Sequence, residues 1–202
     1  GASLLIFWNI LPLYDTAGHA LRDAVFQVTS VISTSGFSTT DYNLWPPFAQ
    51  TILVLLMFVG GCSGSTAGSI KCGRILLLLR SSTRSLLRLS HPRAVRVVKL
   101  DGKVVDEETL RTVSSFFLCF FALLGVGCLV VSLDGYSLTT SFTAALGCLS
   151  NVGPGLDLVG PMGNFGLLSG FNKVFLSLLM LIGRLEIFPI LLLFLPSTWR
   201  RS

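Results

Sequence analysis

The chain has 202 residues, of which 51% are hydrophobic and only 12% are charged, and its mean hydropathy is +0.75. Soluble domains carry roughly 25% charged residues, so this composition excludes an ordinary soluble domain and is typical of a membrane protein. The net charge of +5 does not indicate a nucleic-acid partner, because the basic residues gather in one connection where no aromatic residue interleaves them.

The first residues, Gly1–Tyr14, look like the end of a helix whose beginning was cut away, so we expect a fragment of a longer chain. A short apolar helix is predicted over about 22–32. It leads into the polar stretch 33–38, which contains Gly36. This helix is too short to cross a bilayer, which needs about 20 apolar residues.

The apolar segment 48–80 is long enough to cross the membrane, but a stretch rich in glycine and hydroxyl groups interrupts it. Glycine inside a helix costs about 1 kcal/mol, so the helix should break there. The stretch lacks the lysine spacing of a Walker phosphate loop. It can act as a helix-packing motif or as a loop at mid-depth that obstructs a pore, and we favour the second. Its residues are Gly60, Gly61, Cys62, Ser63, Gly64, Ser65, Thr66, Ala67, Gly68 and Ser69.

Nine of the fifteen basic residues lie between Lys71 and Lys103. This is the positive-inside pattern, and it predicts that the basic loop 71–103 and the C-terminus face the cytoplasm. Asp101-Gly102, between two short apolar runs, predicts a hairpin within the connection 81–108. The charge favours contact with anionic membrane lipid or a cytosolic partner.

The rest of the chain repeats the order of the first part. A spanning helix is predicted over 109–133, with Asp106 as its cap and acidic residues in its first turn. A short helix over 137–149 and the polar stretch 150–155 follow. The last predicted helix covers 171–197 and ends at an aromatic and basic anchor made of Trp199, Arg200 and Arg201.

Two shifts of the sequence relate its halves. A shift of 123 residues aligns Leu176–Gly183 with Leu53–Gly60, with five identical positions of eight. A shift of 117 residues aligns Ser150–Gly153 with Ser33–Gly36. A short helix can lie on the outer surface or enter the membrane, but the repeated order of short helix, polar turn and long helix favours re-entrant pore loops in parallel repeats. We therefore predict an all-α membrane protein with helix–pore loop–helix repeats.

Both polar stretches follow the carboxyl end of a short helix, where the helix dipole favours a cation. Glycine permits backbone conformations that turn carbonyl oxygens toward a pore axis, and a ring of carbonyls can replace the water shell of a monovalent cation. Neither stretch contains a carboxylate, which calcium would favour. The predicted ion-binding residues of this carbonyl filter are Ser33, Thr34, Ser35, Gly36, Phe37, Ser150, Asn151, Val152, Gly153 and Pro154.

Charges near the glycine-rich stretch are the predicted gating groups. The repeat places Arg184 where the first half has Gly61. A charge at membrane depth is costly and usually faces a cavity or a partner. Arg184 can pair with Glu186 as a structural salt bridge or project beneath the filter, and we favour gating, with Lys71 as a second gating charge. The outer acids Asp41, Asp134 and Asp157 can concentrate cations, although each alone reads better as a solvated acid.

The combination of these motifs resembles the Trk/Ktr/HKT superfamily of potassium transporters, and its bacterial Trk pore subunits most closely. The resemblance runs across nearly the whole chain. It rests on Ser33–Tyr42, Phe58–Lys71, His91–Val95, Asn151–Leu156 and Gly183–Phe188.

The family's pore subunit has four repeats. The resemblance therefore implies that 1–80 is a truncated third repeat and 109–202 a complete fourth, about one and a half repeats of a four-repeat pore. It implies Gly36 and Gly153 in the selectivity filter, Gly60–Ser69 as an intramembrane gate loop and Arg184 as its electrostatic companion. It further implies potassium uptake without a cofactor in the bacterial inner membrane, with a missing N-terminal half, a homodimer and a cytosolic ring of nucleotide-binding regulatory subunits.

Two departures from the family pattern keep other functions open. Ser69 stands where glycine is common, and Ser33-Thr34-Ser35 stands where threonines are common, so a sodium-permeable or sodium- and potassium-coupled member is the main alternative. A non-conducting membrane scaffold is a further alternative, in which duplicated filter stretches would have no purpose. An enzyme is not expected, because the sequence lacks an intramembrane set such as His with acids or Ser with His.

Overall fold

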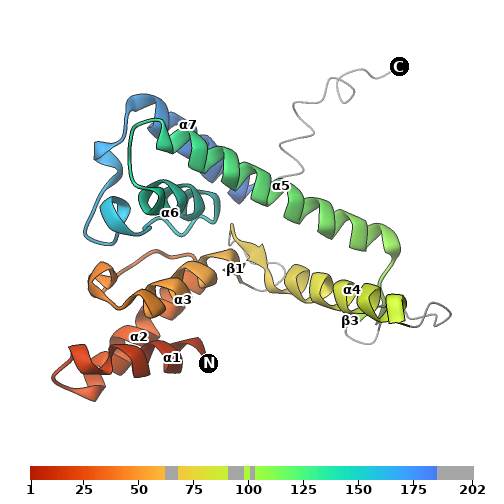
Figure 1. Cartoon of the computed structure of the whole chain (residues 1–202), viewed down its shortest axis with the longest axis horizontal. Helices are drawn as coiled ribbons and strands as arrows, with labels where there is room; N and C mark the ends of the chain where they lie inside the picture. Colours follow the sequence, from red (N-terminus) through yellow and green to blue (C-terminus); the bar gives the residue numbers. More distant parts are fainter. Residues whose placement is uncertain (62–67, 91–97, 101–102, 186–202) are drawn as a thin grey trace.

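The computed structural model describes residues 1–61, 68–90, 98–100 and 103–185. These residues form helices and two short strand pairs, which confirms the prediction of a mostly helical protein. Figure 1 shows two helical layers on one side of the molecule, α1 to α3 in one and α6 with α7 in the other. The long helix α5 runs from the second layer to the opposite side, where it lies beside α4.

The first layer contains α1 (Ala2–Ile10), η1 (Leu11–Leu13), α2 (Ala17–Ile32), η2 (Tyr42–Leu44) and α3 (Pro47–Phe58). Helix α2 ends where the short helix over 22–32 was predicted to end, but it begins five residues earlier. Its buried positions Ala20, Ala24, Val28 and Val31 recur every three or four residues, so the apolar stripe extends beyond the predicted start. Pro47 begins α3, where its fixed backbone angle suits the first helical position.

The segment predicted over 48–80 is broken as expected, but its second part is longer. After α3, strand β1 (Val59–Gly60) pairs in parallel with β2 (Ile70–Lys71), and α4 covers Cys72–Ser90. The predicted boundary at residue 80 is therefore wrong, since the basic connection begins as helix. No proline or glycine stands between Gly73 and Pro92, so nothing in the sequence ends the helix sooner.

The hairpin region and the start of α5 lie beside α4. Strands β3 (Lys99–Leu100) and β4 (Lys103–Val104) pair antiparallel on either side of Asp101-Gly102, which lie outside the described residues. Helix α5 covers Glu107–Ser132. Asp106 occupies the N-cap position as predicted, with Glu107 and Glu108 in the first turn, but its side chain accepts no capping hydrogen bond.

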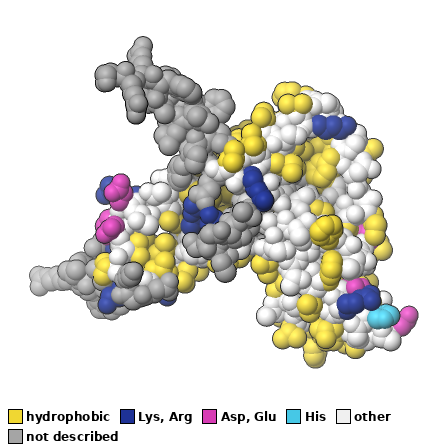
Figure 2. All heavy atoms as spheres, turned by 180° about the vertical axis from the view of Figure 1, so that it is seen from behind, with side chains coloured by type: hydrophobic (Ala, Val, Ile, Leu, Met, Phe, Trp, Pro, Cys, Tyr) yellow, Lys and Arg dark blue, Asp and Glu magenta, His cyan; other side chains and the backbone are white. Residues whose placement is uncertain are grey.

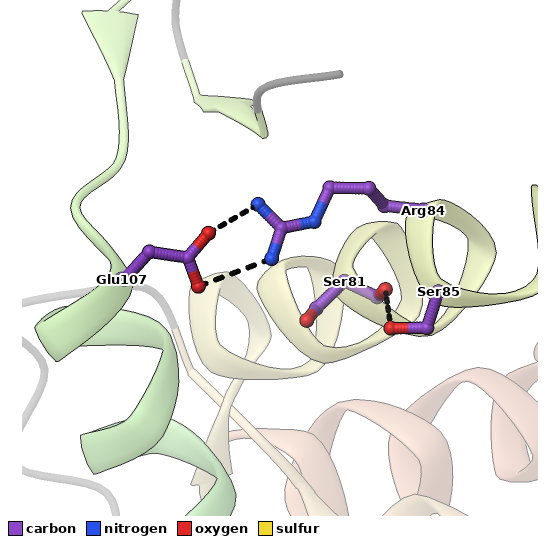
Figure 3. Close-up of polar contacts among 4 residues, drawn as sticks. All are labelled: Ser81, Arg84, Ser85 and Glu107. Carbon is purple, nitrogen blue, oxygen red and sulfur yellow. Dashed lines mark hydrogen bonds and ion pairs between the residues drawn. The ribbon is translucent and has the colours of Figure 1, made fainter. Parts of the chain in front are cut away.

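A bidentate ion pair joins α4 to α5 (Figure 3). The Arg84 guanidinium donates to both carboxylate oxygens of Glu107, with nitrogen–oxygen distances of 2.6 and 3.1 Å. Parallel hydrogen bonds of this kind fix orientation as well as distance. Leu77 of α4 packs with Leu110 and Val113 of α5 in a small apolar cluster beside this pair, so α4 and α5 are joined by charge and by packing.

The second layer contains α6 (Leu138–Leu149), η3 (Asp157–Val159), η4 (Phe165–Leu167) and α7 (Gly170–Arg184). Ser137 caps α6 by accepting a hydrogen bond from the Thr140 amide at 3.2 Å. The last predicted helix, 171–197, corresponds to α7 as far as Arg184. Residues 186–202, with Trp199, Arg200 and Arg201, lie outside the described residues.

Aromatic rings join the two layers at the end of α3. The Phe58 ring lies 6.2, 5.8 and 6.5 Å from the ring centroids of Phe120, Phe121 and Phe142. Such ring pairs contribute about 0.5–1.5 kcal/mol beyond the area that they bury. One core cluster contains residues from both layers, so they pack as one body around this contact.

A second contact between the layers is polar and centres on Asp157. The hydroxyls of Ser137 and Thr140 each donate to the Asp157 carboxylate at 2.6 Å. Asp157 also exchanges hydrogen bonds with Asn43 of the first layer, at 2.9 Å through its amide and 3.1 Å through its carbonyl. These hydroxyl hydrogen bonds hold the pKa of Asp157 below its ordinary value of 3.8.

Among the described residues, α5 is the one helix whose length and apolarity suffice to cross a bilayer, while several others are apolar but shorter. Apolar side chains are spread over the outside of the molecule (Figure 2). On α5 they include Leu118, Phe121, Val126 and Leu129, which are 49–75% exposed. An exposed apolar helix surface of this extent is typical of a face in contact with lipid or another protein.

The Asp157 contact predicts a pH-dependent stability. A carboxyl whose pKa is lowered on folding stabilises the fold at pH values above its unfolded pKa, and this stabilisation is lost as the pH falls through the folded pKa. We expect Asp157→Asn to lower the melting temperature of the detergent-solubilised protein at pH 7, and the difference from wild type to shrink below about pH 4. Asparagine tolerates the positive φ of 59° at this position.

Asp15→Asn is the matched control, because Asp15 is exposed and its side chain has no hydrogen bond among the described residues. We expect it to leave the melting temperature unchanged at both pH values. A deficit in Asp157→Asn that is equally large at pH 7 and at pH 3 would contradict a role for the ionised carboxylate.

Candidate functional site

The two polar turns that follow α2 and α6 have positive φ angles at the same two positions. Thr34 and Asn151 have φ angles of 55° and 57°, and Gly36 and Gly153 have φ angles of 72° and 99°. The members of each pair are related by the shift of 117 residues. Among the described residues, Asp157 is the one further non-glycine residue with a positive φ. Two turns thus share an arrangement that L-residues rarely adopt.

The hydrogen bonds that end the two short helices also correspond. The Ser35 amide donates to the Ser30 carbonyl at 3.0 Å, and the Val152 amide donates to the Gly147 carbonyl at 3.0 Å. The Thr34 and Asn151 amides donate to the third carbonyl before them, each at 3.1 Å. These bonds match between the two halves, and the second turn has one further bond, from the Gly153 amide to the Gly147 carbonyl at 3.2 Å.

The turns lie against each other. A Cβ atom at Gly36 would stand 2.1 Å from the Val152 carbonyl oxygen, closer than side-chain atoms ever come. A Cβ atom at Gly153 would meet nothing within 4 Å. Gly36 is therefore required by its φ and by this close approach, whereas Gly153 is required by its φ alone.

Serine hydroxyls support the first turn from within. Ser30 donates to the Phe37 carbonyl at 2.6 Å and lies 3.2 Å from the Ser35 hydroxyl, which is also 3.2 Å from that of Ser33. An open cavity of about 610 Å³ lies beside this network. It is lined by Phe26, Thr29, Ser30, Ile32, Ser33, Ser35, Phe37 and Gly61. The cavity thus connects the first polar turn to the start of the glycine-rich stretch.

In each half, a hydrogen bond between a carboxylate and a hydroxyl joins the short helix to the chain beyond its turn. The carboxylate lies on the helix in one half and beyond the turn in the other. In the first half the acid is on the helix: buried Asp23 accepts from Thr39 at 3.2 Å. In the second half the hydroxyl is on the helix: Thr140 donates to Asp157 at 2.6 Å. Asp157 is exposed, but the hydroxyls that donate to its carboxylate give it a structural role.

Four residues of the glycine-rich stretch are described, Gly60, Gly61, Gly68 and Ser69, while Cys62, Ser63, Gly64, Ser65, Thr66 and Ala67 lie outside the described residues. The two ends of the stretch meet in the β1–β2 pair, and a Cβ atom at Gly60 would stand 2.8 Å from that of Ser69. The Ser69 hydroxyl donates to the Ser150 carbonyl at 3.3 Å. The stretch is thus held closed at its base and contacts the second polar turn.

The predicted gating charges lie on both sides of this contact. Lys71 is half-buried in β2, two residues beyond Ser69, and Arg184 is exposed in the last turn of α7. Gly183, just before Arg184, approaches the end of α6 so closely that a Cβ atom there would stand 1.9 Å from the Leu149 carbonyl oxygen. Glu186 lies outside the described residues, so both interpretations of Arg184 stay predictions.

Sequence reasoning missed the contacts that join the halves, above all that of Asn43 with Asp157 and that of Gly68 with Asn151. It also missed the role of Asp23 within the first half. One feature of the sequence does indicate the segment that makes the contact between Asn43 and Asp157. The two shifts, 117 and 123, differ by six residues, so the second half has an insertion between its polar turn and its last helix. The structure places η3 and the following turn there, and this insertion carries Asp157 to Asn43.

Comparisons with known proteins agree with this arrangement. The family model described as "TrkH: Cation transport protein" matches residues 12–201. The chain is 39% identical to the Trk system potassium uptake protein TrkH of Salmonella typhimurium and 36% identical to TrkG of Escherichia coli, over 97% and 96% of its length. These alignments cover 40% and 39% of the two relatives, so the chain spans about two fifths of their length.

A solved structure has the same fold. The crystal structure of the potassium transporter TrkH from Vibrio parahaemolyticus matches with a TM-score of 0.90 and 37% identity, over 98% of this chain and 42% of that one. The family match extends over nearly the whole chain and includes both polar turns and the glycine-rich stretch. These findings confirm the resemblance seen in the sequence, and the chain belongs to the TrkH family of cation transport proteins.

Proposed function

We propose that this chain forms part of the potassium pathway of a Trk-type uptake system, with 33–37 and 150–154 as two segments of its selectivity filter. The observation that carries the proposal is the matched left-handed backbone of the two turns, each at the carboxyl end of a short helix. The proposal is supported by the relatives, whose names describe potassium uptake.

The chemistry of the turns suits a dehydrated monovalent cation. The carboxyl end of a helix carries roughly half a negative charge, and α2 and α6 both end at a polar turn. The turns offer backbone carbonyls without a carboxylate, which favours a potassium ion held by carbonyl oxygens over a divalent ion. Two turns make half of a four-fold ring, and the other two would come from the missing N-terminal half.

The glycine-rich stretch Gly60–Ser69 is proposed as the gate of this pathway. Gly61 near its start lines the cavity beside the first turn, and its last residues contact the second turn. A loop in that place obstructs a cation, and Lys71 and Arg184 would add electrostatic repulsion. Gly36 and Gly153 belong to the filter in this arrangement, and Arg184 to the gate.

The surroundings of the pore follow from the family. We place the chain in the bacterial inner membrane, as half of each subunit in a homodimer that rests on a cytosolic ring of nucleotide-binding regulatory subunits. The basic residues of 71–103 would face the cytoplasm and its anionic lipids. The exposed apolar side chains of α5 would face membrane lipid.

Sodium permeation is the second candidate. Ser33 and Ser35 bond to each other and Ser35 to Ser30, so hydroxyls support the first turn where the family commonly has threonines. A smaller, more adaptable support can change the spacing of the carbonyls and thereby the preference between the two ions. A non-conducting scaffold fits less well, because it would not need two strained turns.

Serine at the filter glycines tests the filter. We expect Gly36→Ser and Gly153→Ser in the full-length gene to impair rescue of a potassium-uptake-deficient bacterium and to lower the potassium-over-sodium preference. A strained φ costs about 1–3 kcal/mol, so each substitution should change transport by roughly 5- to 150-fold. Gly36→Ser should be the more severe, because its Cβ also meets the Val152 carbonyl.

Gly135→Ser is the matched control. Gly135 has a φ of 81° and open space around it, but it lies in the turn after α5 and outside both polar turns. It should lower stability without changing the ion preference. Rescue by both filter variants with an unchanged potassium-over-sodium preference would contradict the assignment of these turns to the filter.

Deletion of 63–68 tests the gate. We expect the deletion to raise the leak flux of potassium through the full-length protein in proteoliposomes, because an obstruction is removed. Arg184→Gln should raise the flux in the same direction, whereas Arg111→Gln, at an exposed position in the first turns of α5, should leave it unchanged. An unchanged or lower flux after the deletion would favour a helix-packing role for the glycines.

A further inference from the structure

The Asn151 side chain lies where three segments meet. Its amide group donates to the Met180 carbonyl of α7 at 3.0 Å. A Cβ atom at Gly68 would stand 2.5 Å from the same amide nitrogen, and one at Gly183 would stand 2.9 Å from it. The side chain therefore fills the space between the end of the glycine-rich stretch and the last turn of α7, and both glycines are needed for it to fit.

The neighbouring contact strengthens this junction. Ser69 donates to the Ser150 carbonyl at 3.3 Å, and the two residues are 3% and 0% exposed. Buried hydrogen bonds are costly to break without replacement. Residues 68–69 are thus attached to residues 150–151 by one hydrogen bond and by close packing around one amide.

Within the described part of the chain, the first half has no equivalent of this junction. Thr34 corresponds to Asn151 and has nearly the same φ, 55° against 57°. Its side chain makes no hydrogen bond among the described residues. Asparagine and glycine tolerate a left-handed backbone, but asparagine also supplies an amide donor. Asn151 therefore carries a contact that the backbone conformation alone does not require.

We propose that Asn151 is a positioning residue that couples the gate loop to the second filter segment. It holds Gly68 and Ser69 against the turn through its own packing, and it contacts α7 at Met180, one helical turn before Arg184. The gate loop and the filter then depend on each other through one side chain. This inference rests on the proposed function, since it presumes that 60–69 is the gate and 150–154 part of the filter.

A double-mutant cycle in the full-length protein tests the coupling. Asn151→Gly keeps the backbone conformation and removes the side chain, and Gly68→Ala places a methyl group against the Asn151 amide. We expect Asn151→Gly to raise potassium flux in proteoliposomes by roughly 2- to 30-fold, with the potassium-over-sodium preference unchanged. Gly68→Ala should change the flux in the wild-type background and have little further effect beside Asn151→Gly.

Two further variants serve as a control and as an alternative to Asn151→Gly. Asn164→Gly makes the same change at an exposed asparagine between η3 and η4, outside both polar turns and the glycine-rich stretch, and should leave the flux within about twofold of wild type, inside the range of uncoupled sites. Asn151→Asp keeps the shape but replaces the donor to Met180 with a carboxylate, and it should raise the flux as Asn151→Gly does. It serves as the main variant if Asn151→Gly fails to accumulate as folded protein on size-exclusion chromatography.

The outcomes separate this inference from the function on which it rests. If deletion of 63–68 raises the flux but Asn151→Gly and Asn151→Asp do not, the coupling is wrong and the gate stands. If the deletion leaves the flux unchanged, the gate itself is wrong. Additive effects of Gly68→Ala and Asn151→Gly, or an altered ion preference in Asn151→Gly, would also overturn the coupling, the latter because Asn151 would then act within the filter.

Discussion

The arrangement of this chain depends on the backbone conformation of the turns that follow its two short helices. After α2 and again after α6, the backbone passes through two left-handed residues separated by one ordinary residue. This path reverses the chain within a few residues and keeps its carbonyls near the helix end, where the dipole is negative. The strain of such a path persists only where the surroundings enforce it. The Ser30 hydroxyl, the Gly147 carbonyl and the close approach of Gly36 to Val152 provide those surroundings.

The sequence predicted the helices well where apolar runs end at polar turns, as at Ile32 and Leu149, because periodicity and turn chemistry are local signals. The sequence-based prediction was wrong for α4. The basic residues from Arg80 onward suggested a loop, although no residue there ends a helix. The sequence could not reveal the left-handed Thr34, because threonine is a poor candidate for that conformation. Nor could it pair Asn43 with Asp157 across more than a hundred residues, as such contacts depend on the packed fold.

The repeats differ most where they touch the rest of the chain. The two turns are similar in their φ angles and hydrogen bonds. The carboxylate that ties the first turn, Asp23, lies on a helix, whereas the one that ties the second, Asp157, lies after the turn. The second half adds six residues and uses them to contact the first. The two turns thus share a geometry, while the asymmetry arises at the junctions, where each turn has a different neighbour.

The parallel β1–β2 pair holds the two ends of the glycine-rich stretch together and forms a narrow neck at its base. Helix α3 precedes this neck in the chain and α4 follows it. Helix α4 is a stiff rod whose far part is clamped to α5 by the Arg84–Glu107 pair. From Arg84 to Cys72 the rod measures roughly 18 Å, so a tilt of about 5° about Arg84 moves the neck by roughly 1.5 Å. A displacement of that size exceeds what a hydrogen bond tolerates, so the bond from Ser69 to Ser150 would not survive it. Leu77 packs on α5 between Arg84 and Cys72 and resists such a tilt, so the contact between α4 and α5 holds the base of the loop in place.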